Sequence, residues 1–360
     1  MDRTMLDSSL AQIIRRMPKV ELHVHLEGSI RPGTLLELAR RNEIALPADD
    51  VEGLRRWYRF TDFKHFIEIY LAISACIRTP EDIELIARDF LQGQADQNIR
   101  YSEVTFTPYT HFSTNRRIPF DEQLDALTRG REWGARELGV ECGWVFDVAR
   151  NVRPTEHALI VAEWAIAGRD RGVVGFGLGG LEAGNPPEWF AEAFRRTRAA
   201  GLASLPHAGE VAGAESVRGA VESLGADRIG HGVRCLEDPS LVEIMRRRQI
   251  PLEVCPTSNL CLGISPTLAR HPLPLLLEQG LYVTINSDDP PMFNTTLTDE
   301  YLRIAETFSF GAETIRQFSL NAVRASRLPG GKKDQIEQEI QKEFTTWKSD
   351  PVIFPFSQIQ

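Results

Sequence analysis

Two histidines separated by one residue are the first candidates for chemistry in this chain. His23 and His25 lie in the run VELHVHL, which begins at Val20 and has the apolar, β-branched composition of a strand. Side chains alternate between the faces of a strand, so both imidazoles project from the same face. Such a pair is either a pair of metal ligands or a polar pair on a half-exposed strand. A metal site therefore requires further ligands from elsewhere in the chain.

Two later segments supply candidates for those further ligands. His207 in LPHAGE adds a third imidazole, and Asp288 in INSDDP adds a carboxylate. This set of nitrogen and oxygen donors suits Zn²⁺ with one position left for water; iron or another divalent ion is the alternative. Bound zinc lowers the pKa of water towards about 7. His207 alone would equally suit a core histidine, but the small residues Ala208 and Gly209 leave space for a ligand.

Acid–base candidates flank these ligands. Glu210 follows His207 by three residues, and we expect it to protonate a ring nitrogen, which makes an aromatic C–NH₂ carbon electrophilic. A first-turn glutamate favoured by a helix dipole is the alternative. His231 stands between glycines in RIGHGV, and we expect it to orient or deprotonate the attacking water. A structural histidine in a turn is the alternative there.

Other polar groups suggest a purine substrate. Asp288 and Asp289 are adjacent, so their side chains diverge: one binds metal, and the other faces the substrate, where it can contact an imidazole-type ring nitrogen. A solvated pair of aspartates in a turn is the alternative. The glycine cluster GFGLGG lacks the Lys and Ser/Thr of a P-loop, so we expect the Gly180 N–H to contact a bound base. Glu27 is either a contact to a sugar hydroxyl or a simple turn carboxylate.

The elements that position these residues are predicted by an alternation of short apolar runs with longer stretches of helical periodicity, as in parallel βα units. Most runs end in a residue able to do chemistry, which favours a (β/α)₈ TIM barrel, where the active site lies at the carboxyl ends of the strands. A doubly wound open sheet is the alternative. The eight predicted strands begin at Val20, Arg100, Cys142, Val173, Ala203, Arg228, Pro251 and Leu281.

Additional helices are predicted at two places. The stretch between the first two strands contains PGTLLELARRN and TDFKHFIEIYLAI, which predict a helical insertion that helps to cover the barrel mouth. The tail from Ala312 predicts C-terminal helices that close the domain. We expect one domain over residues 1–360, because no linker interrupts the chain. Four histidines lack partners at ligand spacing and are expected to be structural or exposed: His65, His111, His157 and His271.

Composition limits the function classes. A formal net charge of −9 argues against nucleic-acid binding, so a small, roughly neutral molecule is the expected partner. No stretch of about 18 apolar residues occurs, so membrane insertion is not expected. The five cysteines form no C-x-x-C pair, and we expect reduced thiols in a cytoplasmic protein. The oligomeric state is left open.

Taken together, HVHLEG, HAGE, GHG, CPTSN and SDDP closely resemble the adenosine deaminase family of the amidohydrolase superfamily. Strand four has no lysine that could bridge two metals, so the resemblance implies one Zn²⁺ per chain. It also implies a set of roles: metal ligation by His23, His25, His207 and Asp288, proton donation to purine N1 by Glu210, assistance to the attacking water by His231, and contacts to N7 by Asp289 and to N3 by Gly180.

Within that family, GLGG and Pro206 look more like the aminodeoxyfutalosine deaminases of the alternative menaquinone pathway. We therefore expect 6-aminodeoxyfutalosine as substrate, with adenosine or 2′-deoxyadenosine as the alternative. Free adenine is disfavoured, because Thr257 replaces the leucine of the CPLSN motif typical of adenine deaminases. An amidohydrolase that opens a cyclic amide or ester, and a non-catalytic binding relative, are the remaining alternatives. The latter would be expected to lack a ligand or Glu210.

Overall fold

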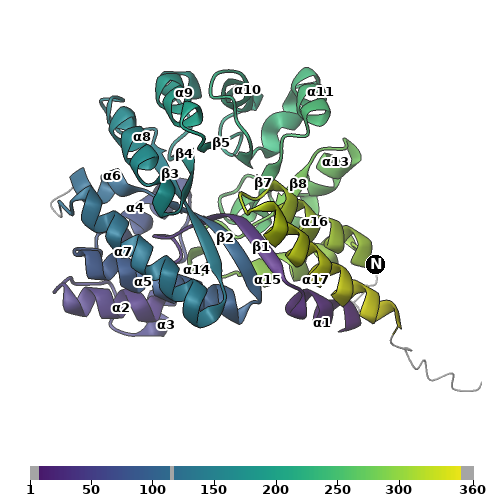
Figure 1. Cartoon of the computed structure of the whole chain (residues 1–360), viewed down its shortest axis with the longest axis horizontal. Coiled ribbons are helices and arrows are strands. Elements are labelled where there is room, and N and C mark those ends of the chain that lie inside the picture. The colour runs from purple at the N-terminus through teal and green to yellow at the C-terminus, as the bar shows by residue number, and fades with distance from the viewer. Residues whose placement is uncertain (1–7, 114–116, 350–360) are drawn as a thin grey trace, which may run out of the picture.

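The computed structural model describes residues 8–113 and 117–349. Eight parallel strands pair in chain order from β1 to β8 (Figure 1). A bridge between Val24 and Asp288 joins the last strand region to the first: His25 N–H donates to the Asp288 carbonyl at 2.9 Å. The predicted barrel is confirmed. Its strands are β1 Lys19–His25, β2 Ile99–Phe106, β3 Glu141–Ala149, β4 Val173–Gly179, β5 Ala203–Ala208, β6 Ile229–His231, β7 Leu252–Val254 and β8 Val283–Ile285.

The last three strands are shorter than the apolar runs that predicted them. β6 ends at His231, whose φ of 62° turns the chain into the left-handed region. β7 ends just before the helix that begins at Pro256. β8 ends before Asn286, whose side-chain oxygen accepts hydrogen bonds from the backbone N–H groups of Leu22 and His23. A side chain thus replaces part of the backbone ladder between β8 and β1.

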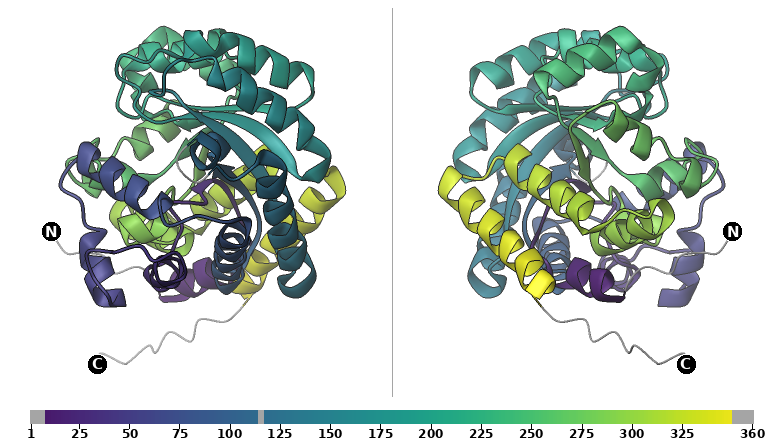
Figure 2. Two further views of the ribbon diagram at one scale, coloured as in Figure 1. Left: turned by 90° about the vertical axis from the view of Figure 1, so that its left-hand side faces the viewer. Right: turned by 90° about the vertical axis from the view of Figure 1, so that its right-hand side faces the viewer.

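Helices surround the strands on all sides (Figure 2). Alternate residues of β3 show the layering: Trp144 and Phe146 pack in the core beneath the helices, whereas Val145 meets Ala203 and Leu205 in a separate small cluster. Outside the insertion and the C-terminal region, the helices are α1 Ser8–Arg16, α6 Pro108–Ser113, α7 Phe120–Trp133, α8 His157–Ala167, α9 Ala191–Ala199, α10 Ala214–Glu222, α11 Pro239–Arg248, α12 Pro256–Cys261, α13 Leu273–Glu278 and α14 Pro290–Phe293.

The predicted helical insertion after the first strand is confirmed. It contains α2 Pro32–Arg41, α3 Val51–Trp57, α4 Phe63–Ser74 and α5 Pro80–Asp96. Thr79 and Asp82 form a capping box at the start of α5, as TPED would predict. Helix α4 approaches the barrel mouth: Phe66 stacks on Phe293 of α14, and the Tyr70 ring lies 6.5 Å from that of His25, centroid to centroid.

The C-terminal helices are also confirmed. They are α15 Leu297–Phe308, α16 Ala312–Ala325 and α17 Gly330–Ser349. α16 lies against β1 and β8, and α17 lies beside α16 on the outer flank of the barrel (Figure 1). An ion pair between Arg324 and Glu337 joins these two helices at 3.0 Å. The C-terminal region therefore covers the strands where the barrel closes.

Candidate active site

Four side chains predicted as metal ligands converge at the carboxyl ends of the strands. His23 and His25 come from β1, His207 from β5, and Asp288 from the segment that follows β8. One ligand atom from each of the four lies within 4.8 Å of the others. Residues as far apart as 23 and 288 therefore meet only because the barrel closes on itself.

The spacing of the ligand atoms fits a tetrahedral ion. His25 Nε2 lies 3.1 Å from His207 Nε2 and 3.3 Å from Asp288 Oδ1, and His23 Nε2 lies 3.5 Å from the same oxygen. Two ligands on one tetrahedral zinc, each about 2.05 Å from the metal, are about 3.3 Å apart. His23 Nε2 is buried and has no hydrogen-bond partner among the described residues. The donor set and its geometry fit a single divalent cation.

The protonation state of His207 also suits a metal ligand. Burial lowers the pKa of His207 well below its usual value, and the nearby His23 and His25 lower it further. The ring is therefore neutral and offers a lone pair. A second trio, His231, Cys255 and Asp288, also lies within 4.8 Å. Burial raises the pKa of Cys255 well above its usual value, so this thiol stays protonated and is the poorer ligand.

A buried chain of charges orients His23. Its Nδ1 lies 3.0 Å from Glu253 Oε2 on β7, and Arg228 bridges Glu253 to Glu103, with 2.5 Å to each carboxylate. A proton on Nδ1 is held by this carboxylate, so the Nε2 lone pair faces the metal cluster. Arg228 thus compensates the negative charges of these two buried carboxylates.

The seam between β8 and β1 fixes Asp288. Its φ of 64° lies in the left-handed region, a strained conformation for aspartate that persists only where neighbouring contacts hold it. The preceding Ser287 donates from both N–H and Oγ to Glu21, at 3.1 and 2.5 Å. Glu21 also accepts from Gln94 of α5 at 2.8 Å. Asp288 is thereby tied to the insertion as well as to β1.

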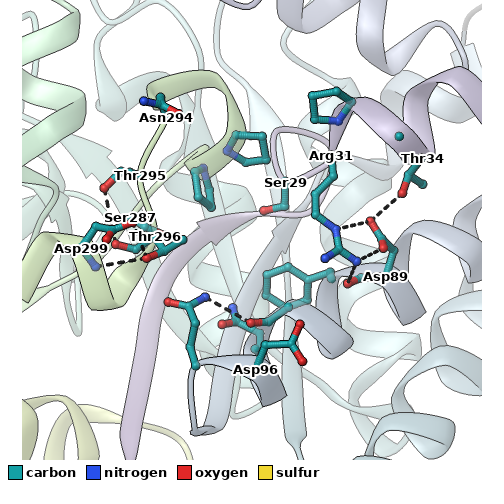
Figure 3. Close-up of a pocket in the computed structure, with 18 of the residues that line it drawn as sticks. Ser29, Arg31, Thr34, Asp89, Asp96, Ser287, Asn294, Thr295, Thr296 and Asp299 are labelled. Atoms are coloured by element: carbon teal, nitrogen blue, oxygen red, sulfur yellow. Dashed lines mark hydrogen bonds and ion pairs between the residues drawn. The ribbon is translucent and has the colours of Figure 1, made fainter. Parts of the chain in front are cut away.

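Ser287 and Glu21 also line a cavity of about 720 Å³ between α2, α5 and the start of α15 (Figure 3). Arg31 lies at its rim and pairs with Asp89, while Thr296 and Asp299 face it from the opposite side. Among the described residues, none of the four candidate metal ligands lines this cavity. It lies next to the β8 to β1 seam but is distinct from the metal cluster.

Glu210 lies just beyond β5, beside the cluster. Its Oε1 is 3.7 Å from His231 Nε2. Burial raises its pKa well above the usual value, and the charges of Asp288 and Glu182 add to the effect, so the carboxyl group can carry a proton at neutral pH. Glu182 accepts from the N–H groups of Gly209, Glu210 and Val211 at 2.8 to 3.0 Å, which holds the loop that presents Glu210.

Hydrogen bonds determine the tautomer of His231. His271 Nδ1 accepts from Leu273 N–H, so its Nε2–H donates to Asn259 Oδ1 at 3.0 Å. That orients the Asn259 amide nitrogen towards His231 Nδ1, 3.5 Å away. Burial lowers the pKa of His231 to about 3, so the ring is neutral, with its proton on Nε2. His231 therefore directs an N–H donor towards Glu210 and Asp288, which favours orienting the attacking water over deprotonating it.

The groups expected to contact a purine lie around the same mouth. Asp289 Oδ1 is buried with no partner among the described residues, and Gly28 leaves room for it, since a Cβ there would lie 1.6 Å from this oxygen. Gly180 follows β4 with a φ of 83°, and a Cβ there would lie 2.4 Å from Asn151 Oδ1. Glycine is therefore needed at both positions.

Glu27 is held at the barrel mouth by residues that follow β2. Its Oε1 accepts from Thr107 N–H and lies 3.0 Å from His111 Nε2, while its Oε2 is buried without a partner among the described residues. The predicted contact to a sugar hydroxyl could involve only Oε2. Of the histidines expected to be structural or exposed, His111 holds Glu27, His271 holds Asn259, and His157 bonds the Pro154 carbonyl.

Sequence reasoning missed several supporting residues. Glu253 carried a usable signal, because a carboxylate in the middle of the apolar run PLEVCP requires a buried partner. Asn259 belongs to CPTSN, one of the motifs that carry the family resemblance. Glu182 lies in an ordinary loop sequence, LEAGN, and carried no such signal.

Such a barrel, with three histidines and an aspartate at its mouth, defines a metal-dependent amidohydrolase. The adenosine deaminase family matches residues 18–343, and the chain belongs to this family. It is a hydrolytic deaminase that acts on a C–N bond of a small molecule. No helix among the described residues has the length and apolar character needed to cross a membrane.

Relatives within the family carry two different names. An aminodeoxyfutalosine deaminase of Streptomyces avermitilis is 41% identical over 94% of both chains. An adenine deaminase of Cupriavidus necator is 37% identical over 96% of this chain and 97% of its own. A crystal structure of an amidohydrolase from Burkholderia ambifaria with bound zinc has a TM-score of 0.87, is 26% identical, and is matched over 95% of this chain and 96% of that chain.

Proposed function

We propose that this chain is a zinc-dependent deaminase that converts the 6-amino group of an adenine nucleoside derivative to a 6-oxo group with release of ammonia. The observation that carries this proposal is the convergence of His23, His25, His207 and Asp288 at tetrahedral spacing, with Glu210 beside them. When bound, zinc supplies Lewis-acid activation of the attacking water.

The residues around the cluster then move the protons. Glu210 donates its proton to N1, which makes C6 electrophilic. His231 orients the water through its Nε2–H, and Asp288 Oδ2, 3.9 Å from that nitrogen, accepts the water proton as oxygen bonds to C6. Asp288 passes this proton to the amino group, which leaves as ammonia. The remaining hydroxyl proton returns to Glu210 as the 6-oxo group forms.

The purine is held by contacts on its other edges. Asp289 Oδ1, which is buried without a partner among the described residues, contacts N7. The Gly180 N–H contacts N3. In this pose C6 faces the metal cluster, N9 points away from it, and a substituent on N9 extends towards the side of the mouth where Glu27 lies.

The preferred substrate in this proposal is 6-aminodeoxyfutalosine, with adenosine or 2′-deoxyadenosine as the second candidate. The relatives named aminodeoxyfutalosine deaminase, at 41% identity, support the first choice. Thr257 disfavours free adenine by resemblance alone, and its hydroxyl accepts a hydrogen bond from Arg303 at 3.0 Å. Since other relatives are named adenine deaminases, adenine belongs in the test.

The test is ammonia release by zinc-loaded protein, with kcat/KM compared for 6-aminodeoxyfutalosine, adenosine, 2′-deoxyadenosine and adenine. The proposal predicts the highest value for 6-aminodeoxyfutalosine. A higher value for adenosine would assign the enzyme to purine salvage, and a higher value for adenine would contradict the nucleoside assignment. If no 6-aminopurine released ammonia, the amidohydrolase acting on a cyclic amide and the non-catalytic relative would be the remaining readings.

A further inference from the structure

Asp147 is a buried carboxylate at the barrel mouth that takes no part in the proton transfers proposed for the deaminase reaction. It lies near the carboxyl end of β3, two residues beyond Val145, which packs inside the barrel. Its side chain is only 3% exposed. Through Gly179 it neighbours His207, because an added Cβ at this glycine would approach both side chains. Asp147 therefore belongs to the same mouth as the metal cluster.

Two glycines on the neighbouring strand make room for this carboxylate. Gly177 pairs with Asp147 in the sheet, and a Cβ at Gly177 would lie 3.0 Å from Asp147 Cβ. A Cβ at Gly179 would lie 2.3 Å from Asp147 Oδ2 and 4.0 Å from the His207 ring. Neither glycine has a positive φ, so backbone conformation does not require glycine at these positions. The space they leave is filled by the Asp147 side chain.

Only one of the two carboxylate oxygens has a protein partner. Thr107 Oγ1 donates to Asp147 Oδ1 at 2.8 Å, and Thr107 N–H donates to Glu27 Oε1 at 3.0 Å. Thr107 thus fixes both carboxylates at once. Among the described residues no donor reaches Asp147 Oδ2, and Asp147 is not one of the four candidate metal ligands. Asp147 Oδ2 is therefore an oriented acceptor, held beside Gly179, without a protein donor among the described residues.

We propose that Asp147 Oδ2 accepts a hydrogen bond from a ribose hydroxyl of the substrate and so makes the site selective for ribonucleosides. This inference rests on the proposed function, which directs the Gly180 N–H to purine N3. Oδ2 lies beside Gly179, the residue before Gly180. N3 and N9 are bonded to the same ring carbon, so the sugar on N9 lies on this side of the purine.

The charge of Asp147 fits an acceptor. The hydrogen bond from Thr107 favours the ionised carboxylate, which accepts hydrogen bonds only. A sugar hydroxyl is a donor of matching chemistry. The N–H at N9 of free adenine is the other donor that can reach this side.

The experiment compares zinc-loaded wild type and Asp147→Asn with adenosine, 2′-deoxyadenosine, 3′-deoxyadenosine and adenine. A hydrogen bond to a charged acceptor predicts that the variant loses about 10- to 100-fold in kcat/KM for adenosine. For the analogue that lacks the contacted hydroxyl, the expected loss is less than about threefold. An equal loss for all four substrates would overturn the proposal, and so would a loss largest for adenine, which would identify N9–H as the donor.

Two further variants separate positioning from folding. Thr107→Val keeps the side-chain shape but removes the donor to Oδ1, and Gly179→Ala displaces Oδ2; both should show the same selective loss. Gly93→Ala, in α5 with no atom within 4 Å of the added Cβ, is the control for Gly179→Ala and should match wild type. Calorimetric binding of inosine and its 2′- and 3′-deoxy analogues requires no turnover. It therefore distinguishes failure of this inference from failure of the proposed deaminase activity.

Discussion

His23 Nδ1 lies 3.0 Å from Glu253 Oε2, on the edge of the ring opposite the nitrogen that faces the metal cluster. Replacing Glu253 with Gln removes the negative charge that holds this imidazole but keeps the shape of the side chain at position 253. Loss of such a supporting carboxylate costs about 10- to 100-fold in metal affinity. Titration with zinc against a competing chelator measures this change in zinc affinity. Glu243→Gln, at an exposed site on α11, is the control and should leave zinc affinity unchanged.

Zinc binding should release protons. In the metal-free protein, burial lowers the pKa of His23, but the neighbouring carboxylates of Asp288 and Glu253 outweigh it and raise the value to about 10. For His25, burial is likewise outweighed by Asp289 and Asp288, and the pKa rises to about 9. Both rings are therefore positively charged at pH 7, with a proton on each nitrogen. Zinc requires neutral rings, so each must release one proton when the metal binds.

Apparent zinc affinity should consequently rise with pH from 7 to about 9 and level off above about 10. Calorimetry at pH 7 in buffers of different ionisation enthalpy counts the protons, and each of the two rings should contribute one. Zinc binding without proton release at pH 7 would mean that these histidines are already neutral, or are not the ligands.

Glu210→Gln should abolish most turnover while leaving the ground state intact. The amide cannot donate a carboxyl proton to N1, and general-acid catalysis contributes about 10²- to 10⁴-fold. We expect kcat to fall by that factor, with zinc content and inosine affinity near wild type. Glu222→Gln, in an exposed pair with Arg218, is the matched control. Near-normal kcat in Glu210→Gln would show that another group protonates the ring.

Gly28→Ala tests whether Asp289 contacts the purine. The added Cβ would lie 1.6 Å from Asp289 Oδ1 and must displace this carboxylate. We expect Gly28→Ala and Asp289→Ala to lower kcat/KM for the preferred substrate by at least about tenfold, with one zinc still bound per chain. Gly33→Ala, where the added Cβ meets no atom within 4 Å, should behave as wild type. Undiminished turnover by Asp289→Ala would contradict a purine contact at this position.

The barrel and the positions of the main site residues were predictable because their signals are local. Strand alternation placed His23 and His25 on one face, and recurring βα units placed His207 and Asp288 at the same edge of the barrel. The ends of β6 to β8 were less predictable. They depend on where His231 turns into the left-handed region and on the Asn286 side chain that substitutes for the ladder.

The residues that support the site were not predictable from the sequence, because each pairs with a residue of a different strand. Glu253 meets His23 from 230 residues away, and Thr107 meets Asp147 from 40 residues away. Such partners depend on strand register and on side-chain rotamers, which no local pattern encodes. The tautomer of His231 likewise depends on His271, a residue whose sequence surroundings indicate no role in the site.

The most direct test of a zinc-dependent deaminase is the metal dependence of ammonia release from 6-aminodeoxyfutalosine and adenosine. Zinc is removed by a chelator, the chelator is dialysed away, and zinc is returned in steps while ammonia is measured. Activity should be lost on zinc removal and should recover to a plateau at one zinc per chain, with no recovery in His207→Ala. Full activity in the metal-free protein would contradict zinc dependence.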